Sequence, residues 1–139
     1  MWTPMFENCA KGVWMLVDTD VLIWFLRGRS SALDAIRRCP SVELSAVSYM
    51  ELVRGVQDKK ELRMLLRTIR INGWRILPLT ESISHRATLY IENYALSDGM
   101  RVADALIAAS AVQSGASLMT ANVRHYKCIP DIKLEHYRP

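Results

Sequence analysis

The sequence predicts an α/β protein, a three-layer α/β/α sandwich around a mainly parallel central sheet. Two observations support this prediction. Short apolar runs alternate along the chain with segments of helical periodicity, which is typical of a parallel sheet between helices. The first run, Val13 to Val17, is continuously apolar, as expected for a strand that is buried on both faces.

The first third of the chain is predicted to contain one strand and two short helices. Asp20 is the expected N-cap of the first helix, because its side chain can accept a hydrogen bond from a free backbone amide. Gly28 and Pro40 end the two helices. The predicted elements are a strand over 13–17, a helix over 20–27 and a helix over 31–38.

Two strands and two helices are predicted for the middle of the chain. Asn72-Gly73 follows the second helix, where a glycine commonly ends a helix, and Pro78 follows the second strand. The elements are a strand over 42–46, helices over 48–57 and 61–71, and a strand over 74–77.

The last third has the most apolar predicted helix, over residues 102–114, which is rich in Ala and is expected to be buried on most sides. Thr80 is placed to cap the helix before it, and Gly115 occupies the position after a helix end that glycine favours. The elements are a helix over 80–95, a turn over 97–99, the helix over 102–114, and strands over 117–119 and 132–135.

Length and composition fit one folded domain. The chain has 139 residues, of which 50% are hydrophobic and 23% charged, so global disorder and a second independent core are excluded. We expect a single domain over residues 15–139. Residues 1–14 fit the pattern worst and are predicted to be an N-terminal extension, or a leader before an alternative start at Met15.

Charge and cysteine content indicate the class of partner and the compartment. The chain has 18 Lys+Arg against 14 Asp+Glu and a net charge of +4, which favours an anionic partner without establishing one. Its three widely spaced cysteines match neither a disulfide framework nor a zinc site. No apolar run is long enough to span a bilayer. We therefore expect a cytoplasmic protein without a membrane partner.

Three acidic residues stand where ligands bind in parallel sheets, beyond the carboxyl ends of strands. Asp18 directly follows the first buried run, where an unpaired charge would cost several kcal/mol, so a cation is implied. Asp104 lies in the most apolar helix. Glu51 follows the second strand but also completes the pattern Ser48-x-x-Glu51, and we favour the interpretation that it caps its own helix.

If the three carboxylates converge, a hard divalent cation such as Mg²⁺ or Mn²⁺ fits them. These ions prefer oxygen ligands and retain several waters, so a few carboxylates suffice to hold them. Without a cation, clustered carboxylates would repel one another. With one, they could position a phosphodiester and activate an attacking water.

Four segments together resemble the PIN-domain ribonucleases, specifically the VapC-type toxins of toxin–antitoxin pairs. The resemblance covers about residues 15–135, and its most specific part is D-A-L-I-A-A followed by G-x-x-L-x-T-x-N-x-x-H-Y. The segments, in order, read LVDTDVLIWFL, SAVSYMELVRG, LSDGMRVADALIAASAVQSGASLMTANVRHY and IPDIKL.

The resemblance implies a PIN-like fold and a metal-dependent endoribonuclease selective for single-stranded RNA. By residue-to-residue match, Asp18, Glu51 and Asp104 would form the catalytic Mg²⁺ or Mn²⁺ site, with a metal-bound water as nucleophile. The expected partners are an RNA substrate, a cognate antitoxin and a second copy of the chain in a homodimer.

Further residues are expected to support this site or to contact its partners. Many PIN domains have a fourth acid where this chain has Asn122, which we expect to orient a metal-bound water. Asp98 could supply a fourth charge, although a Ser-Asp-Gly turn explains it equally well. Thr120 is placed to hydrogen-bond a carboxylate, and Asp20 lies beside Asp18. The candidate contacts to RNA or antitoxin are Arg27, Arg54, Arg101 and Arg124.

Two other functions remain open from the sequence. Asp18-Thr19-Asp20-Val21 also fits the opening motif of haloacid-dehalogenase-like phosphatases, with Asp18 as nucleophile and Asp20 as acid/base. The later motifs of that class are missing. The chain could also be a non-catalytic PIN-like module that binds RNA or protein.

Overall fold

The computed structural model describes residues 14–139, and the part of the predicted N-terminal extension that covers residues 1–13 lies outside the described residues. A five-stranded sheet with the order β3-β2-β1-β4-β5 forms the centre, and every neighbouring pair is parallel. The strands are β1 (Met15–Val17), β2 (Val42–Ser45), β3 (Arg75–Leu77), β4 (Ser117–Thr120) and β5 (Leu134–His136).

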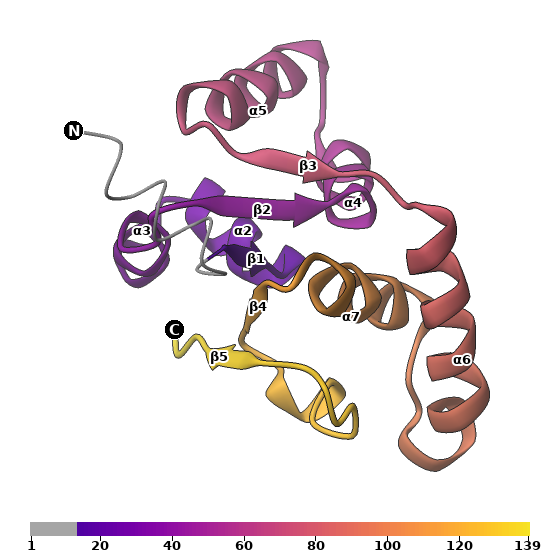
Figure 1. Cartoon of the computed structure of the whole chain (residues 1–139). Helices are drawn as coiled ribbons and strands as arrows, with labels where there is room; N and C mark the ends of the chain where they lie inside the picture. The colour runs from indigo at the N-terminus through magenta and orange to yellow at the C-terminus, as the bar shows by residue number, and fades with distance from the viewer. Residues whose placement is uncertain (1–13) are drawn as a thin grey trace.

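Helices cover both faces of this sheet, which confirms the predicted three-layer sandwich (Figure 1). The helices are α2 (Thr19–Leu26), α3 (Ser30–Arg37), α4 (Ala46–Gly55), α5 (Lys59–Ile71), α6 (Glu81–Asp98) and α7 (Val102–Ser114). A short 3₁₀ helix, η1 (Val123–His125), which the sequence pattern did not predict, follows β4. Within residues 14–139 no helix is long and apolar enough to cross a bilayer.

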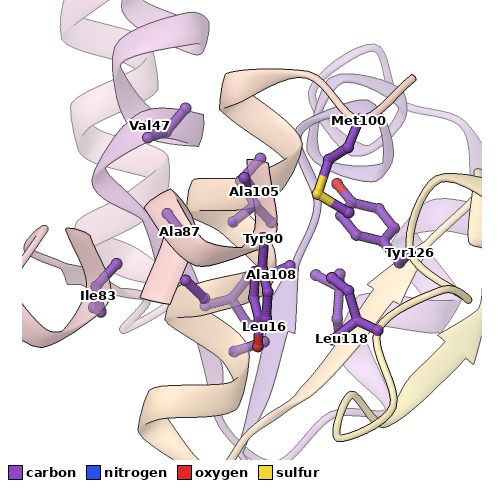
Figure 2. Close-up of a cluster of buried hydrophobic side chains, with 14 of the residues drawn as sticks. Leu16, Val47, Ile83, Ala87, Tyr90, Met100, Ala105, Ala108, Leu118 and Tyr126 are labelled. Atoms are coloured by element: carbon purple, nitrogen blue, oxygen red, sulfur yellow. The ribbon is translucent and has the colours of Figure 1, made fainter. Parts of the chain in front are cut away.

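Two hydrophobic clusters lie on opposite faces of the sheet because successive strand residues point to opposite sides. Leu16 and Leu118, neighbours in the β1–β4 register, pack under α6 and α7 (Figure 2). Val17 and Met119, the next pair in that register, belong to the second cluster with α2, α3 and α5. The apolar run of the first strand is therefore buried from both sides, as predicted.

The start of α2 corrects one prediction. Asp18, and not Asp20, is the N-cap: its side chain accepts a hydrogen bond from the Thr19 amide, and the helix begins at Thr19. The strand ends directly at the cap, so no residue is left between them. Asp20 consequently lies in the first turn of α2.

The start of α4 corrects the interpretation of Glu51. Ser45 is the N-cap, with its hydroxyl accepting from the Val47 amide, so the helix begins at Ala46, two residues earlier than predicted. Ser48 is a buried residue inside the helix. The capping-box interpretation of Ser48 and Glu51 was therefore wrong, and Glu51 is free to act elsewhere.

The end of α6 changes the interpretation of Asp98. The helix continues through Asp98, three residues beyond the predicted end. Gly99 then ends it in the left-handed conformation, with φ 65°, which glycine adopts without steric cost. Asp98 is thus the last residue of a helix and not part of a separate turn.

Parallel pairing brings the carboxyl ends of β1 and β4 to one edge of the sheet. The Asp18 amide donates to the Met119 carbonyl at 2.9 Å, which extends the β1–β4 pairing one residue beyond β1. The chain segments that leave these two strands therefore start side by side, and the candidate site forms between them.

We predict that Leu118→Ala lowers the free energy of unfolding by about 2–5 kcal/mol, because Leu118 is fully buried and truncation leaves a cavity beside Leu16. Urea denaturation followed by circular dichroism measures the change. Ile71→Ala, at an exposed position at the end of α5, is the control and should alter stability by less than about 0.5 kcal/mol. Equal effects of the two substitutions would contradict the assignment of the core.

Candidate metal centre

A pocket of about 210 Å³ opens at the carboxyl edge of the sheet. It brings together four carboxylates from three segments that are far apart in the sequence: the start of α2, the middle of α4 and the start of α7. Its lining consists of Asp18, Thr19, Asp20, Glu51, Arg101, Ala103, Asp104, Ile107, Asn122 and His125. The predicted convergence of Asp18, Glu51 and Asp104 on one pocket is therefore what the structure shows.

Asp18 is the most deeply held of the four acids, with only 7% of its surface exposed. Its Oδ2 accepts hydrogen bonds from the Thr120 hydroxyl at 2.8 Å and from the Tyr126 hydroxyl at 3.0 Å. Its Oδ1 accepts from the Thr19 amide at 2.8 Å. The carboxylate is thus fixed by groups from β4, from the residue after η1 and from α2.

The surroundings of Asp18 disfavour its charged form. Burial raises its pKa to about 6, and the neighbouring Asp20 carboxylate adds to the effect, although the three hydrogen bonds oppose it. Burial also raises the pKa of Asp20. Both raised pKa values reflect the cost of holding a carboxylate charge in a buried place, and a bound cation would offset that cost.

Tyr126 connects two of the site acids and was absent from the predicted site. Its side chain is fully buried, and its hydroxyl, which donates to Asp18, also lies 3.5 Å from Asp104 Oδ1. Burial and the nearby carboxylates raise the pKa of Tyr126, so it remains a proton donor. In the sequence, only its place at the end of the N-V-R-H-Y segment pointed to it. Its inward position depends on η1, which the sequence pattern did not predict.

Glu51 lies on the exposed rim of the pocket. The Thr19 hydroxyl donates to its Oε1 at 2.8 Å, and the same hydroxyl is 2.8 Å from Ser48 Oγ. This contact links α2 to α4 and holds the carboxylate at the pocket. Glu51 thus belongs to the site, and not to the cap of its own helix.

Asp104 lies in the first turn of α7, with 13% of its side chain exposed. Arg101 Nε and His125 Nδ1 are 3.7 Å and 3.9 Å from its Oδ2. Both side chains therefore line the pocket next to this acid. Arg101 was a predicted RNA or antitoxin contact, whereas His125 was not among the predicted site residues.

The other predicted supporting residues separate into two groups. Thr120 hydrogen-bonds Asp18, as expected, and Asn122 Nδ2 donates to Asp20 Oδ2 at 2.8 Å, so this amide holds a second acid.

Asp98 does not line the pocket, and its carboxylate accepts from Ser97 instead. The side chains of Arg27, Arg54 and Arg124 do not line it either.

The donor set fits a hard divalent cation. Asp18, Glu51 and Asp104 present carboxylate oxygens, which Mg²⁺ and Mn²⁺ prefer. Among residues 14–139 no three Asp, Glu, His or Cys side chains lie close enough together to surround a metal ion. Mg²⁺ usually keeps several waters and is bound through one or two carboxylates, so it does not need all three acids as direct ligands.

Comparison with known proteins gives consistent matches. The family model described as PIN domain matches residues 15–128. Ribonuclease VapC10 of Mycobacterium tuberculosis (strain ATCC 25618 / H37Rv) is 34% identical over 86% of this chain and 90% of that protein. A toxin-antitoxin complex from Klebsiella pneumoniae matches with a TM-score of 0.70 and 25% identity, over 85% of this chain and 94% of the other.

A second solved structure supports the fold alone. VapBC2 from Rickettsia felis, bound to a DNA fragment from its promoter, matches with a TM-score of 0.73 and 20% identity. The match covers 90% of this chain and 99% of the other. The layered arrangement of sheet and helices is therefore shared with that structure.

We predict that the metal-free protein loses stability as the pH rises, because the folded state binds the Asp18 proton more tightly than the unfolded chain does. This contribution is complete below about pH 4 and is lost as the pH rises through about 6. Asp18→Asn cannot titrate, so its free energy of unfolding relative to wild type should increase by on the order of 2–3 kcal/mol from pH 4 to pH 7.5.

Urea unfolding in EDTA at several pH values measures this difference. Asp34→Asn, which removes one exposed charge on α3, is the control for charge loss alone. A difference between Asp18→Asn and wild type that stays constant across this pH range would contradict the raised pKa.

Proposed function

The chain belongs to the PIN-domain family and is a VapC-type ribonuclease toxin, and from this we propose that its acidic pocket binds Mg²⁺ or Mn²⁺ and cleaves single-stranded RNA. The observation that carries the proposal is the convergence of Asp18, Glu51 and Asp104 on one pocket. The family match decides against the phosphatase alternative for Asp18 and Asp20.

In this proposal Asp18, Glu51 and Asp104 hold the cation, directly or through its bound waters. When bound, Mg²⁺ or Mn²⁺ stabilises developing charge on a phosphodiester and lowers the pKa of an attacking water. The protein contributes the positions of the three acids. Thr120 and Tyr126 fix Asp18, and Thr19 fixes Glu51, so the ligand oxygens lose little conformational freedom on binding.

Arg101 and His125 are proposed to contact the substrate. Both lie at the pocket mouth within 4 Å of Asp104 Oδ2, and the Arg101 side chain is 76% exposed. An exposed guanidinium can bind a phosphate with two parallel hydrogen bonds. Asn122 donates a hydrogen bond to Asp20, and we propose that it supports the site by fixing this carboxylate.

A cognate antitoxin is the expected protein partner, as in the toxin–antitoxin complexes that resemble this chain. We propose that it docks in an apolar groove of about 600 Å³ between α2, α4 and α5. Leu26 and Met64 in this groove are 39% and 59% exposed, which is unusual for large apolar side chains. Glu51 lies in both the groove and the acidic pocket, so a bound segment would reach the site.

We further propose a homodimer and a cytoplasmic location. Leu89, Leu96 and Val102 expose apolar surface on α6 and the start of α7, and a second copy of the chain would cover it. Both described cysteines, Cys39 and Cys128, are free thiols, which is the usual state of cysteines in a reducing compartment.

Asp104→Asn is expected to reduce cleavage of unstructured RNA by more than about 100-fold, because it removes a proposed metal ligand and not merely a residue that supports one. EDTA should abolish wild-type cleavage, and Mn²⁺ or Mg²⁺ should restore it. Time courses with a labelled single-stranded RNA and a stable hairpin, resolved by gel electrophoresis, measure both effects.

The control for this experiment is Asp98→Asn, which removes an acid that does not line the pocket and should leave the rate unchanged. If wild-type protein cleaves neither RNA at high concentration with either metal, the non-catalytic alternative replaces the nuclease.

Tyr126→Phe tests the positioning of Asp18 and Asp104. Removing one hydroxyl takes a hydrogen bond from Asp18 and the neighbouring oxygen from Asp104. We expect metal affinity to fall by about 10–100-fold, with activity partly recovered at high Mn²⁺. A Mn²⁺ titration of the cleavage rate measures this. A fall in rate that no Mn²⁺ concentration relieves would contradict the positioning role.

A further inference from the structure

The cationic side chains of α5 gather on one side of the helix. Lys59, Lys60, Arg63, Arg67 and Arg70 are all exposed. With 3.6 residues per turn, their positions fall within an arc of about 100°. We call these five residues the α5 stripe. The buried residues of the helix, Leu65 and Ile69, point away from it.

The α5 stripe has no neutralising partner within the described part of the chain. None of its five cations takes part in an ion pair there, and Glu61 is the only acid in the helix. The helix thus has a net charge of +4, equal to that of the whole chain. The remaining residues are neutral overall, so the basic surplus noted in the sequence is concentrated on this one helix.

The fold alone does not account for this concentration. The five side chains are solvent-exposed, and like charges three and four residues apart on a helix are mildly destabilising. Three of the five are arginines, whose planar guanidinium groups suit bidentate contacts with phosphate. The chemistry of the stripe therefore matches a polyanion with phosphate groups.

The position of α5 relates the stripe to the acidic pocket. The helix lies outside the β3 edge of the sheet (Figure 1). Met64 and Thr68 line the groove that also contains Glu51, and Lys60 and Arg67 are their helix-face neighbours on the solvent side. The stripe therefore follows the outer rim of a groove that leads to the proposed catalytic carboxylates.

We propose that the α5 stripe is a docking surface for the phosphodiester backbone of RNA, which holds the strand that flanks the segment in the acidic pocket. This inference rests on the proposed nuclease function for the identity of the polyanion. Contacts to phosphates carry no base preference, so the stripe supplies affinity, and the sequence preference would come from elsewhere.

The test compares two triple variants that each lose three positive charges. R63Q/R67Q/R70Q removes the arginines of the stripe and keeps good helix formers at exposed positions. R37Q/R38Q/K133Q is the matched control, since these exposed residues lie outside α5. Both are made with Asp104→Asn, so that RNA stays intact, and their melting temperatures are checked first.

Binding of a labelled single-stranded poly(U) of about 20 nucleotides is measured by fluorescence anisotropy at several salt concentrations. Loss of three phosphate contacts should reduce the slope of log K against log salt by about 2 and weaken binding at 0.15 M salt by on the order of 50-fold. The matched control should bind as the Asp104→Asn protein does.

Binding by the stripe variant that equals the control, with an equal salt slope, overturns the proposal. Binding of labelled poly-glutamate is measured in the same way. If the stripe variant loses poly-glutamate binding but keeps RNA binding, the proposal is overturned in favour of an acidic protein partner. Cleavage by the wild-type protein is assayed separately. A failure of the proposed nuclease function therefore appears as absent cleavage, whereas a failure of the docking surface appears as unchanged RNA affinity.

Discussion

The site depends on one buried carboxylate and the hydroxyl groups that hold it. Asp18 ends β1 and caps α2, and it accepts hydrogen bonds from Thr120 on β4 and from Tyr126. Burying this charge is costly, and the raised pKa of Asp18 reflects the cost. The fold tolerates it because three donors satisfy the carboxylate, and the cation that we propose would offset the cost further.

Charge is unevenly distributed in this protein. Acidic groups from α2, α4 and α7 meet in one small pocket, while the net positive charge of the chain equals that of α5 alone. A cation bound in the pocket would neutralise the acidic groups, and an RNA backbone would neutralise the basic side chains of α5. With a cation in the pocket, one RNA strand could contact both regions, with its cleaved segment at the cation and its flanking strand along the helix.

The sequence predicted the layered fold and the three acids because these depend on local patterns: apolar runs, helical periodicity and a family motif. Of the partners that fix the acids it predicted Thr120, but neither Tyr126 nor Thr19. Thr19 meets Glu51 only because α2 and α4 pack together, and Ser45 displaced the local capping pattern at Ser48. The ion pair between buried Glu43 and Arg75 on adjacent strands was likewise hidden, since it depends on the β2–β3 register.

Anomalous diffraction from crystals grown with Mn²⁺ tests the central claim most directly. The account predicts a Mn²⁺ peak in the acidic pocket, within coordinating distance of Asp18 or Asp104, and loss of that peak in Asp104→Asn crystals. A pocket without a Mn²⁺ peak in the wild-type protein at saturating metal, or a peak that persists in both Asp104→Asn and Asp18→Asn, would contradict it.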